Sequence, residues 1–128
     1  MSLRVEVDLA AGVPPYEQIR LQILAHVTAR RLQVGDRLPA IRDLATDLGV
    51  ATGTVARAYR ELEAAGVVAT RRRTGTVVAE GAVVAEAPMR AAAARFVAAA
   101  RTAGMADDEI LDLVRGALLT SDRTTVRD

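Results

Sequence analysis

The feature that most constrains the fold is a change in hydrophobic period at Gly66. Before Gly66, apolar residues recur every three or four positions, which is the spacing of amphipathic helices. After it, apolar residues alternate in two short runs, which predicts a β-hairpin with its tip at 71–75. The sequence therefore predicts three helices followed by a hairpin, over 16–31, 40–48, 52–65, 67–70 and 76–79.

The order of these segments is typical of a winged helix-turn-helix domain. The second helix is short, and the turn Leu48-Gly49-Val50 separates it from the third. Such a pattern alone is a weak signal, so the basic hairpin that follows directly adds support. We expect a mostly α-helical chain with a small β-hairpin, in which residues 1–80 form the winged helix-turn-helix domain.

The third predicted helix has an apolar and a polar side. At about 100° per residue, its apolar residues fall together and must face the first two helices; they are Val55, Ala58, Tyr59 and Leu62. The other side carries candidate DNA contacts: Thr52, Gly53, Thr54, Arg57 and Arg60. Arg57 has the guanidinium fork that can donate to guanine O6 and N7. The alternative is a solvated face on which Arg57 pairs with Glu61.

Basic residues also mark the hairpin tip and the second helix. Arg71, Arg72 and Arg73 are adjacent, with no acid beside them, which favours contacts to phosphates or the minor groove. Thr74 and Gly75 complete the tip, where glycine lets the backbone approach DNA closely. Arg42 is expected to lie off the apolar face of the second helix, within reach of the DNA backbone. For Arg42 and the tip arginines, a solvated surface position is the alternative.

The last third of the chain is predicted to be a dimerisation region. We expect a linker over 81–88, two helices within 89–120 and a frayed tail over 121–128. Two such helices cannot enclose a small-molecule pocket of about 300 Å³, but they can present an apolar stripe to a second copy. The stripe comprises Phe96, Val97, Ala100, Ile110, Leu111, Val114 and Leu118. Alternatively, both helices fold back on their own winged domain; helix exchange between subunits also stays open.

The composition leaves little for catalysis. There is no cysteine, one histidine and no lysine, so thiolate chemistry and a lysine Schiff base are excluded. His26 is expected to be satisfied or solvent-facing, and Asp107, Asp108 and Glu109 suit a helix N-terminus better than a metal site. We therefore expect no enzyme, no cofactor and no metal. The sequence has no apolar run of signal-peptide or membrane-helix length, which predicts a cytoplasmic protein without a membrane partner.

Several motifs within residues 14–79 together resemble the DNA-binding domain of the GntR family of bacterial transcription regulators. They are Pro15-Tyr16-Glu17-Gln18-Ile19, Gly35-Asp36-Arg37-Leu38-Pro39, Arg42-Asp43-Leu44-Ala45, Tyr59-Arg60-Glu61-Leu62-Glu63 and Gly75-Thr76. Phe96-Val97 and the acidic run from Asp107 resemble the two-helix tail of the YtrA-type subfamily.

The resemblance implies a dimeric regulator, a pseudo-palindromic operator and a neighbouring transporter operon. Carried over by position, it implies DNA contacts at Arg42, Thr52 to Thr54, Arg57 and the wing tip Thr74-Gly75. Ala40 and Ala51 stand where the family usually has serine, so two helix caps are expected to be missing.

The predicted function is a sequence-specific regulator of transcription, a repressor that binds double-stranded DNA as a homodimer. The alternatives are a protein-interaction module and a non-specific DNA-binding protein. Several arginine–phosphate contacts would make DNA affinity fall steeply with salt, whereas a protein-interaction module predicts no such dependence. No residue identifies a small-molecule effector.

Overall fold

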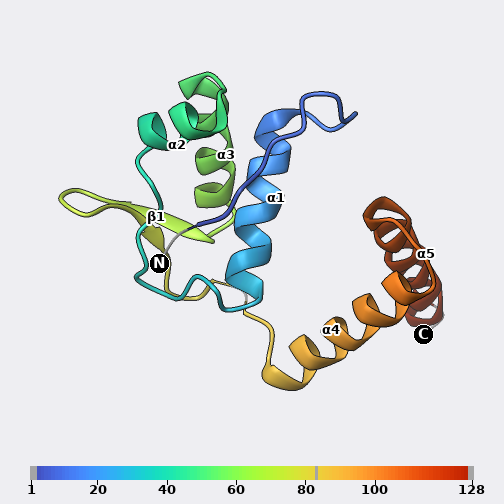
Figure 1. The fold of residues 1–128 in the computed structure, drawn as a ribbon. Coiled ribbons are helices and arrows are strands. Elements are labelled where there is room, and N and C mark those ends of the chain that lie inside the picture. The colour runs from blue at the N-terminus through green and yellow to red at the C-terminus, as the bar shows by residue number, and fades with distance from the viewer. Residues whose placement is uncertain (1–2, 83, 127–128) are drawn as a thin grey trace. The chain divides into compact units, whose positions relative to one another are not determined.

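The computed structural model describes residues 3–82 and 84–126 (Figure 1). Its elements are α1 (Pro15–Thr28), α2 (Ile41–Leu48), α3 (Thr52–Ala64), β1 (Val68–Arg71), β2 (Gly75–Val78), α4 (Ala87–Thr102) and α5 (Asp107–Val126). The chain divides into two compact units, residues 1–85 and 86–128. The first unit has the predicted order of three helices and a hairpin, so the mostly helical fold class is confirmed.

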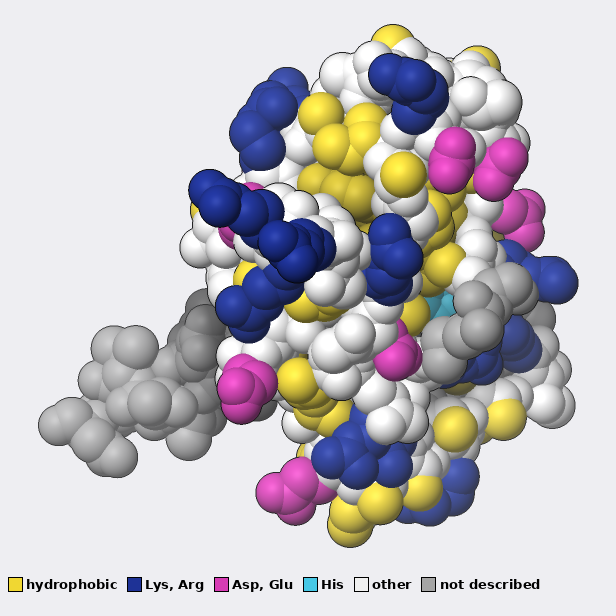
Figure 2. Space-filling model, turned by 90° about the vertical axis from the view of Figure 1, so that its left-hand side faces the viewer, with side chains coloured by type: hydrophobic (Ala, Val, Ile, Leu, Met, Phe, Trp, Pro, Cys, Tyr) yellow, Lys and Arg dark blue, Asp and Glu magenta, His cyan; other side chains and the backbone are white. Residues whose placement is uncertain are grey.

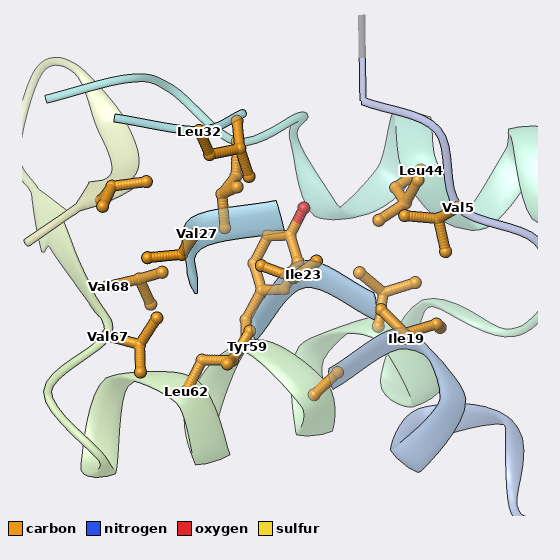
Figure 3. Close-up of a cluster of buried hydrophobic side chains, with 14 of the residues drawn as sticks. Val5, Ile19, Ile23, Val27, Leu32, Leu44, Tyr59, Leu62, Val67 and Val68 are labelled. Atoms are coloured by element: carbon orange, nitrogen blue, oxygen red, sulfur yellow. The ribbon is translucent and has the colours of Figure 1, made fainter. Parts of the chain in front are cut away.

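The core of the first unit lies between α1 and α3, which pack on each other, while α2 and β1 also pack on α3. Ile19, Ile23 and Val27 recur at every fourth position of α1 and are fully buried. The predicted apolar side of α3 is also buried, and Figure 3 shows Tyr59 and Leu62 beside the α1 side chains. Each buried isoleucine or leucine stabilises the fold by about 1.5–3 kcal/mol, so this contact holds α3 in place.

Tyr59 also ties α3 to the chain before α2. Its hydroxyl donates to the Pro39 carbonyl oxygen at 2.7 Å, and its side chain is buried. Burial raises the pKa of Tyr59, so the hydroxyl stays protonated and continues to donate.

The segment Gly35–Pro39, which precedes α2, pairs with the hairpin. Arg37 forms an antiparallel bridge with Val77. The Leu38 N–H donates to the Thr76 carbonyl, and the Val78 N–H donates to the Asp36 carbonyl. Because the two named strands pair antiparallel with Val68 opposite Val78, this segment covers the other edge of β2. Both strands of the wing thus contact the rest of the domain: β1 packs on α3, and β2 pairs with this segment. Sequence spacing did not predict the second contact.

The chain before α1, for which the sequence predicted no element, lies along that helix. Three polar side chains spaced four residues apart on α1 hold its backbone. The hydrogen bonds are 2.6–2.9 Å long and join Gln22 to Glu6, Gln18 to Asp8 and His26 to Arg4. His26 is therefore a satisfied side chain, as expected, and Val5 of this segment reaches the core.

Four helices end in the same backbone motif, with one residue in the left-handed region. Gly49, Gly66 and Gly104 occupy that position after α2, α3 and α4, at φ values of 71°, 79° and 87°. Gly49 and Gly66 are the glycines that the sequence places at these helix ends. After α1 the position is held by Arg30 at φ 65°, and the Arg31 N–H donates to the His26 carbonyl. The helix thus ends at Thr28. The predicted end at Arg31 is wrong, because no glycine in the sequence marks the end of this helix.

The left-handed conformation of Arg30 is expected to cost stability. Replacing Arg30 by glycine removes the Cβ clash and should raise the free energy of unfolding by about 1 kcal/mol. Urea denaturation measures the change, with Arg31→Gly as the control at a neighbouring position without a positive φ. Equal effects of the two substitutions would contradict this account.

The expected absence of two helix caps is confirmed. Ala40 and Ala51 precede α2 and α3, and neither helix has a side-chain cap hydrogen bond. The backbone still closes the first turns, because the Leu44 N–H donates to the Ala40 carbonyl at 3.0 Å and the Thr54 N–H to the Ala51 carbonyl at 3.0 Å.

In the second unit, the helices extend beyond the bounds expected from the sequence. The expected linker over 81–88 gives way to α4 at Ala87, where Pro88 fits the first turn. The tail over 121–128, expected to fray, is helical as far as Val126. This stretch contains neither glycine nor proline, so nothing in it interrupts the backbone hydrogen bonds of α5. Residues 127–128 lie outside the described part.

Candidate nucleic-acid interface

The polar side of α3 is open to solvent as expected. Thr52, Gly53, Arg57 and Arg60 are exposed, and Thr54 is half-buried. Since the opposite side of α3 forms the core, this side of the helix is available to a large partner such as a DNA groove. That these residues contact DNA stays a prediction.

Arg57 has two partners that hold its guanidinium. The Arg57 Cζ atom lies 3.8 Å from the centroid of the Tyr16 ring, a cation–π contact. The Arg57 Nε donates to Glu61 Oε2 at 3.3 Å, which is the intrahelical pair given above as the alternative. The side chain is nevertheless 54% exposed. Pairing with Glu61 and access to a partner therefore coexist at Arg57.

The first turn of α1 extends this set of charges. Arg20 donates to both carboxylate oxygens of Glu17, at 2.8 and 2.7 Å, and its Nε lies 3.8 Å from Glu61 Oε1. The hydrogen bonds from Arg20 lower the pKa of Glu17, so that carboxylate is ionised at physiological pH. The sequence does not indicate that Tyr16, Glu17 and Arg20 are neighbours of α3, because no spacing rule links the start of one helix to the side of another.

The hairpin presents an exposed basic tip. β1 and β2 pair with Arg71 opposite Gly75, and residues 71–75 are all exposed. Gly75 has φ 92°, a conformation that side chains rarely adopt, which explains the glycine at this position. Figure 2 looks onto the side of the molecule that carries the hairpin, and several basic side chains gather there.

Arg37 is a further basic residue at the wing that the sequence analysis did not select. A Cβ placed on Gly75 would lie 3.9 Å from both Nε and Nη2 of Arg37. The pairing of Arg37 with Val77 explains this proximity. The only sequence signal was its place in the Gly35–Pro39 motif.

Arg42 lies on the exposed side of α2, as expected, while Leu44 and Ala45 are buried. Its own carbonyl accepts a hydrogen bond from the Thr46 hydroxyl at 2.9 Å. Contact with the DNA backbone stays a prediction for Arg42.

In the second unit, the predicted apolar stripe is exposed only in part. Leu111 and Leu118 are 53% and 60% exposed, Phe96 and Val114 are exposed to a lesser degree, and Val97 is half-buried. Ala100 and Ile110 were also expected to be exposed, but both are buried in the single chain. They flank the turn at 103–106 that joins α4 to α5. Ala100 and Ile110 are therefore not part of the surface open to a partner.

The acidic residues at the start of α5 serve the helix. The Ala106 N–H donates to Glu109 Oε1 at 2.8 Å, the Glu109 N–H donates to Asp108, and Asp107 pairs with Arg101 at 3.1 Å. These contacts match the expectation that acids complement the helix N-terminus.

None of the helices within the described ranges combines the length and the hydrophobicity needed to cross a membrane.

Comparisons with known proteins agree with this architecture. Residues 15–78 match the family described as bacterial regulatory proteins, gntR family. The chain is 53% identical over 81 residues to the HTH-type transcriptional regulator Rv1152 of Mycobacterium tuberculosis, covering 62% of this chain and 67% of that one. It is 37% identical over 76 residues to the HTH-type transcriptional repressor YtrA of Bacillus subtilis, covering 59% of this chain and 58% of that protein.

A solved structure extends the similarity beyond the winged domain. YtrA from Sulfolobus acidocaldarius, described as a GntR-family transcription factor, matches with a TM-score of 0.56 at 30% identity, covering 92% of this chain and 99% of that one. The family match spans the three helices and the hairpin described above. The chain belongs to the GntR family and is a DNA-binding transcription regulator.

Proposed function

We propose that two copies of this chain bind a pseudo-palindromic operator, each placing the N-terminal half of α3 in a major groove. The observation that carries the proposal is the position of α3. Its apolar side is fixed in the core, while Thr52, Gly53 and Arg57 are exposed at its N-terminal half. A recognition helix uses this half to contact base edges, so α3 has the exposure that base contact requires.

The residues proposed for the DNA backbone lie on two other elements. Arg42 extends from α2, and Arg71, Arg72 and Arg73 from the wing tip, all of them exposed. Thr74 and Gly75 complete the tip, and Arg37 beside Gly75 adds a further positive charge. Contacts between arginine and phosphate fix the orientation of a protein on DNA without selecting its sequence. Arg60 is exposed on α3. We assign it to DNA contact without choosing between a base and the backbone.

The proposed dimer uses the exposed part of the C-terminal apolar stripe. Phe96, Leu111, Val114 and Leu118 are exposed in the single chain, and association of two copies would remove them from water. A homodimer matches the two halves of a pseudo-palindromic site, because the two-fold symmetry of the protein then coincides with that of the DNA.

Repression is the proposed outcome of binding. A dimer on an operator excludes polymerase without any further domain, and the similar Bacillus subtilis protein is named a repressor. The alternative of non-specific DNA binding rests on the same arginines, so sequence preference is the property that separates the two functions.

Selection from a random pool of double-stranded DNA tests the proposal. The expected result is an enriched inverted repeat with half-sites about one helical turn apart, bound with an affinity that falls steeply as salt rises. Salt-sensitive binding without an enriched sequence would establish a non-specific DNA-binding protein instead. Absence of binding at low salt would overturn the proposal and favour a protein-interaction module.

A further inference from the structure

The guanidinium of Arg57 is supported on one face and along one edge. The Tyr16 ring lies under its face, with 3.8 Å between the Arg57 Cζ and the ring centroid. Glu61 accepts from its Nε at 3.3 Å. Tyr16 comes from the first turn of α1 and Glu61 from the turn of α3 after Arg57. Two elements that pack together in the core thus fix the direction of one exposed side chain.

The edge of Arg57 that matters for base contact stays open. Its contacts with described residues use Nε and the ring face, and the two terminal nitrogens Nη1 and Nη2 take part in none of them. Nη1 and Nη2 are the pair that can donate to O6 and N7 of a guanine. With 54% of the side chain exposed, these donors are available to a base.

Glu61 is itself held from the side of α1. Its Oε1 lies 3.8 Å from the Arg20 Nε, and Arg20 is fixed by two hydrogen bonds to Glu17. The carboxylate therefore lies between two guanidinium groups. Its charge is balanced locally, which lessens its repulsion of a DNA phosphate.

We propose that Tyr16 and Glu61 are specificity-determining positioning residues: they set the Arg57 guanidinium in advance so that its Nη1–Nη2 edge faces a guanine. This inference rests on the proposed function. A free arginine side chain populates many rotamers and must lose that freedom when it binds. Here the Tyr16 ring and the Glu61 carboxylate restrict the Arg57 side chain before DNA binds. This restriction improves discrimination between bases and does not act by increasing the positive charge of the interface.

The test compares two operator duplexes that differ at one base pair. That base pair is the guanine position at which Arg57→Ala loses its preference. For each variant, the ratio of the two dissociation constants measures discrimination. Tyr16→Leu keeps an apolar side chain but removes the π-face, and we expect the ratio to fall about threefold, the size of an exposed cation–π contact. Tyr16→Phe retains the face and is expected to keep the parent ratio.

Glu61→Gln gives a second, independent measurement. It removes a negative charge, so binding to both duplexes should strengthen, while the weaker hold on Arg57 should lower their ratio. Glu63→Gln is the matched control, because Glu63 lies on the same helix but contacts Thr70 and not Arg57. This control should strengthen binding to both duplexes and leave the ratio unchanged.

The outcomes separate this inference from the proposed function. Urea denaturation of each variant checks that the fold is retained, and equal ratios for Tyr16→Leu and Tyr16→Phe would overturn the role of Tyr16 alone. Equal ratios for Glu61→Gln and Glu63→Gln would overturn the role of Glu61. If the parent protein selects no operator, the proposed function fails and this inference fails with it.

Discussion

Replacing Leu111 and Leu118 together by aspartate is expected to convert the proposed dimer to a monomer and to weaken operator binding by roughly 100-fold to 10,000-fold. Both side chains are more than half exposed in the single chain, so the substitutions leave its core untouched. In a dimer, each would bury an unpaired carboxylate, which is strongly unfavourable. The loss in affinity follows because two linked binding modules exceed either alone by about 10²–10⁴.

Leu119→Asp is the matched control for this prediction. Leu119 is 69% exposed, but it lies one residue beyond Leu118 and so is turned by about 100° from it around the helix. We expect this variant to remain a dimer. Sedimentation equilibrium and operator titration measure the two properties on the same samples. A monomeric variant that binds the operator like the parent would contradict the dimeric mechanism, as would a double variant that stays dimeric.

The second large effect is expected at Arg57. Substitution by alanine removes the paired donors and should cost about 1–3 kcal/mol of discrimination at one guanine. Arg57→Lys retains the positive charge without the fork, so it should recover non-specific affinity but not the base preference. Titration of the operator and of its single-base variants measures both quantities.

Arg72→Ala gives the contrasting result. The Arg72 side chain is exposed at the wing tip, so its loss should weaken binding to all sequences about equally. It should also reduce the slope of log affinity against log salt by about 0.9, the value for one phosphate contact. If both Arg57→Ala and Arg72→Ala bind every sequence like the parent, the assignment of the interface is wrong.

The winged fold was predictable because local signals coincide there. The apolar face of α3 lies on the helix that it predicts. Gly66 follows the end of that helix and also marks the change of hydrophobic period at the start of the hairpin. These signals act through backbone geometry and local burial, so a single sequence contains them. The exposed side of α3 follows by exclusion once the buried side is known.

The missed features depend on contacts between distant segments. Pairing of Arg37 with Val77, and the contact of Tyr16 with Arg57, each join residues about forty positions apart. No periodicity specifies such a contact, because it follows from how α1, α3 and the wing pack. The end of α1 was missed for a different reason, since Arg30 takes a conformation that usually marks glycine.

The dimerisation stripe shows the limit of assigning exposure by helical period. Period alone places Ala100 and Ile110 with Phe96 and Leu111 as one apolar surface. The structure separates them, since the first two are buried in the single chain. A helical pattern predicts which residues share a face, but it does not determine how exposed each of them is in the folded chain.

A spacing series on the selected operator tests the central claim most directly. Duplexes carry the two half-sites at their selected separation, with about five or about ten base pairs inserted, or with one half-site scrambled. Two winged domains held in one dimer should bind the selected separation with two chains per duplex. They should lose most of their affinity when about half a helical turn places the half-sites on opposite faces of the DNA. Equal affinity for all four duplexes would contradict the account, because each chain would then bind its half-site alone.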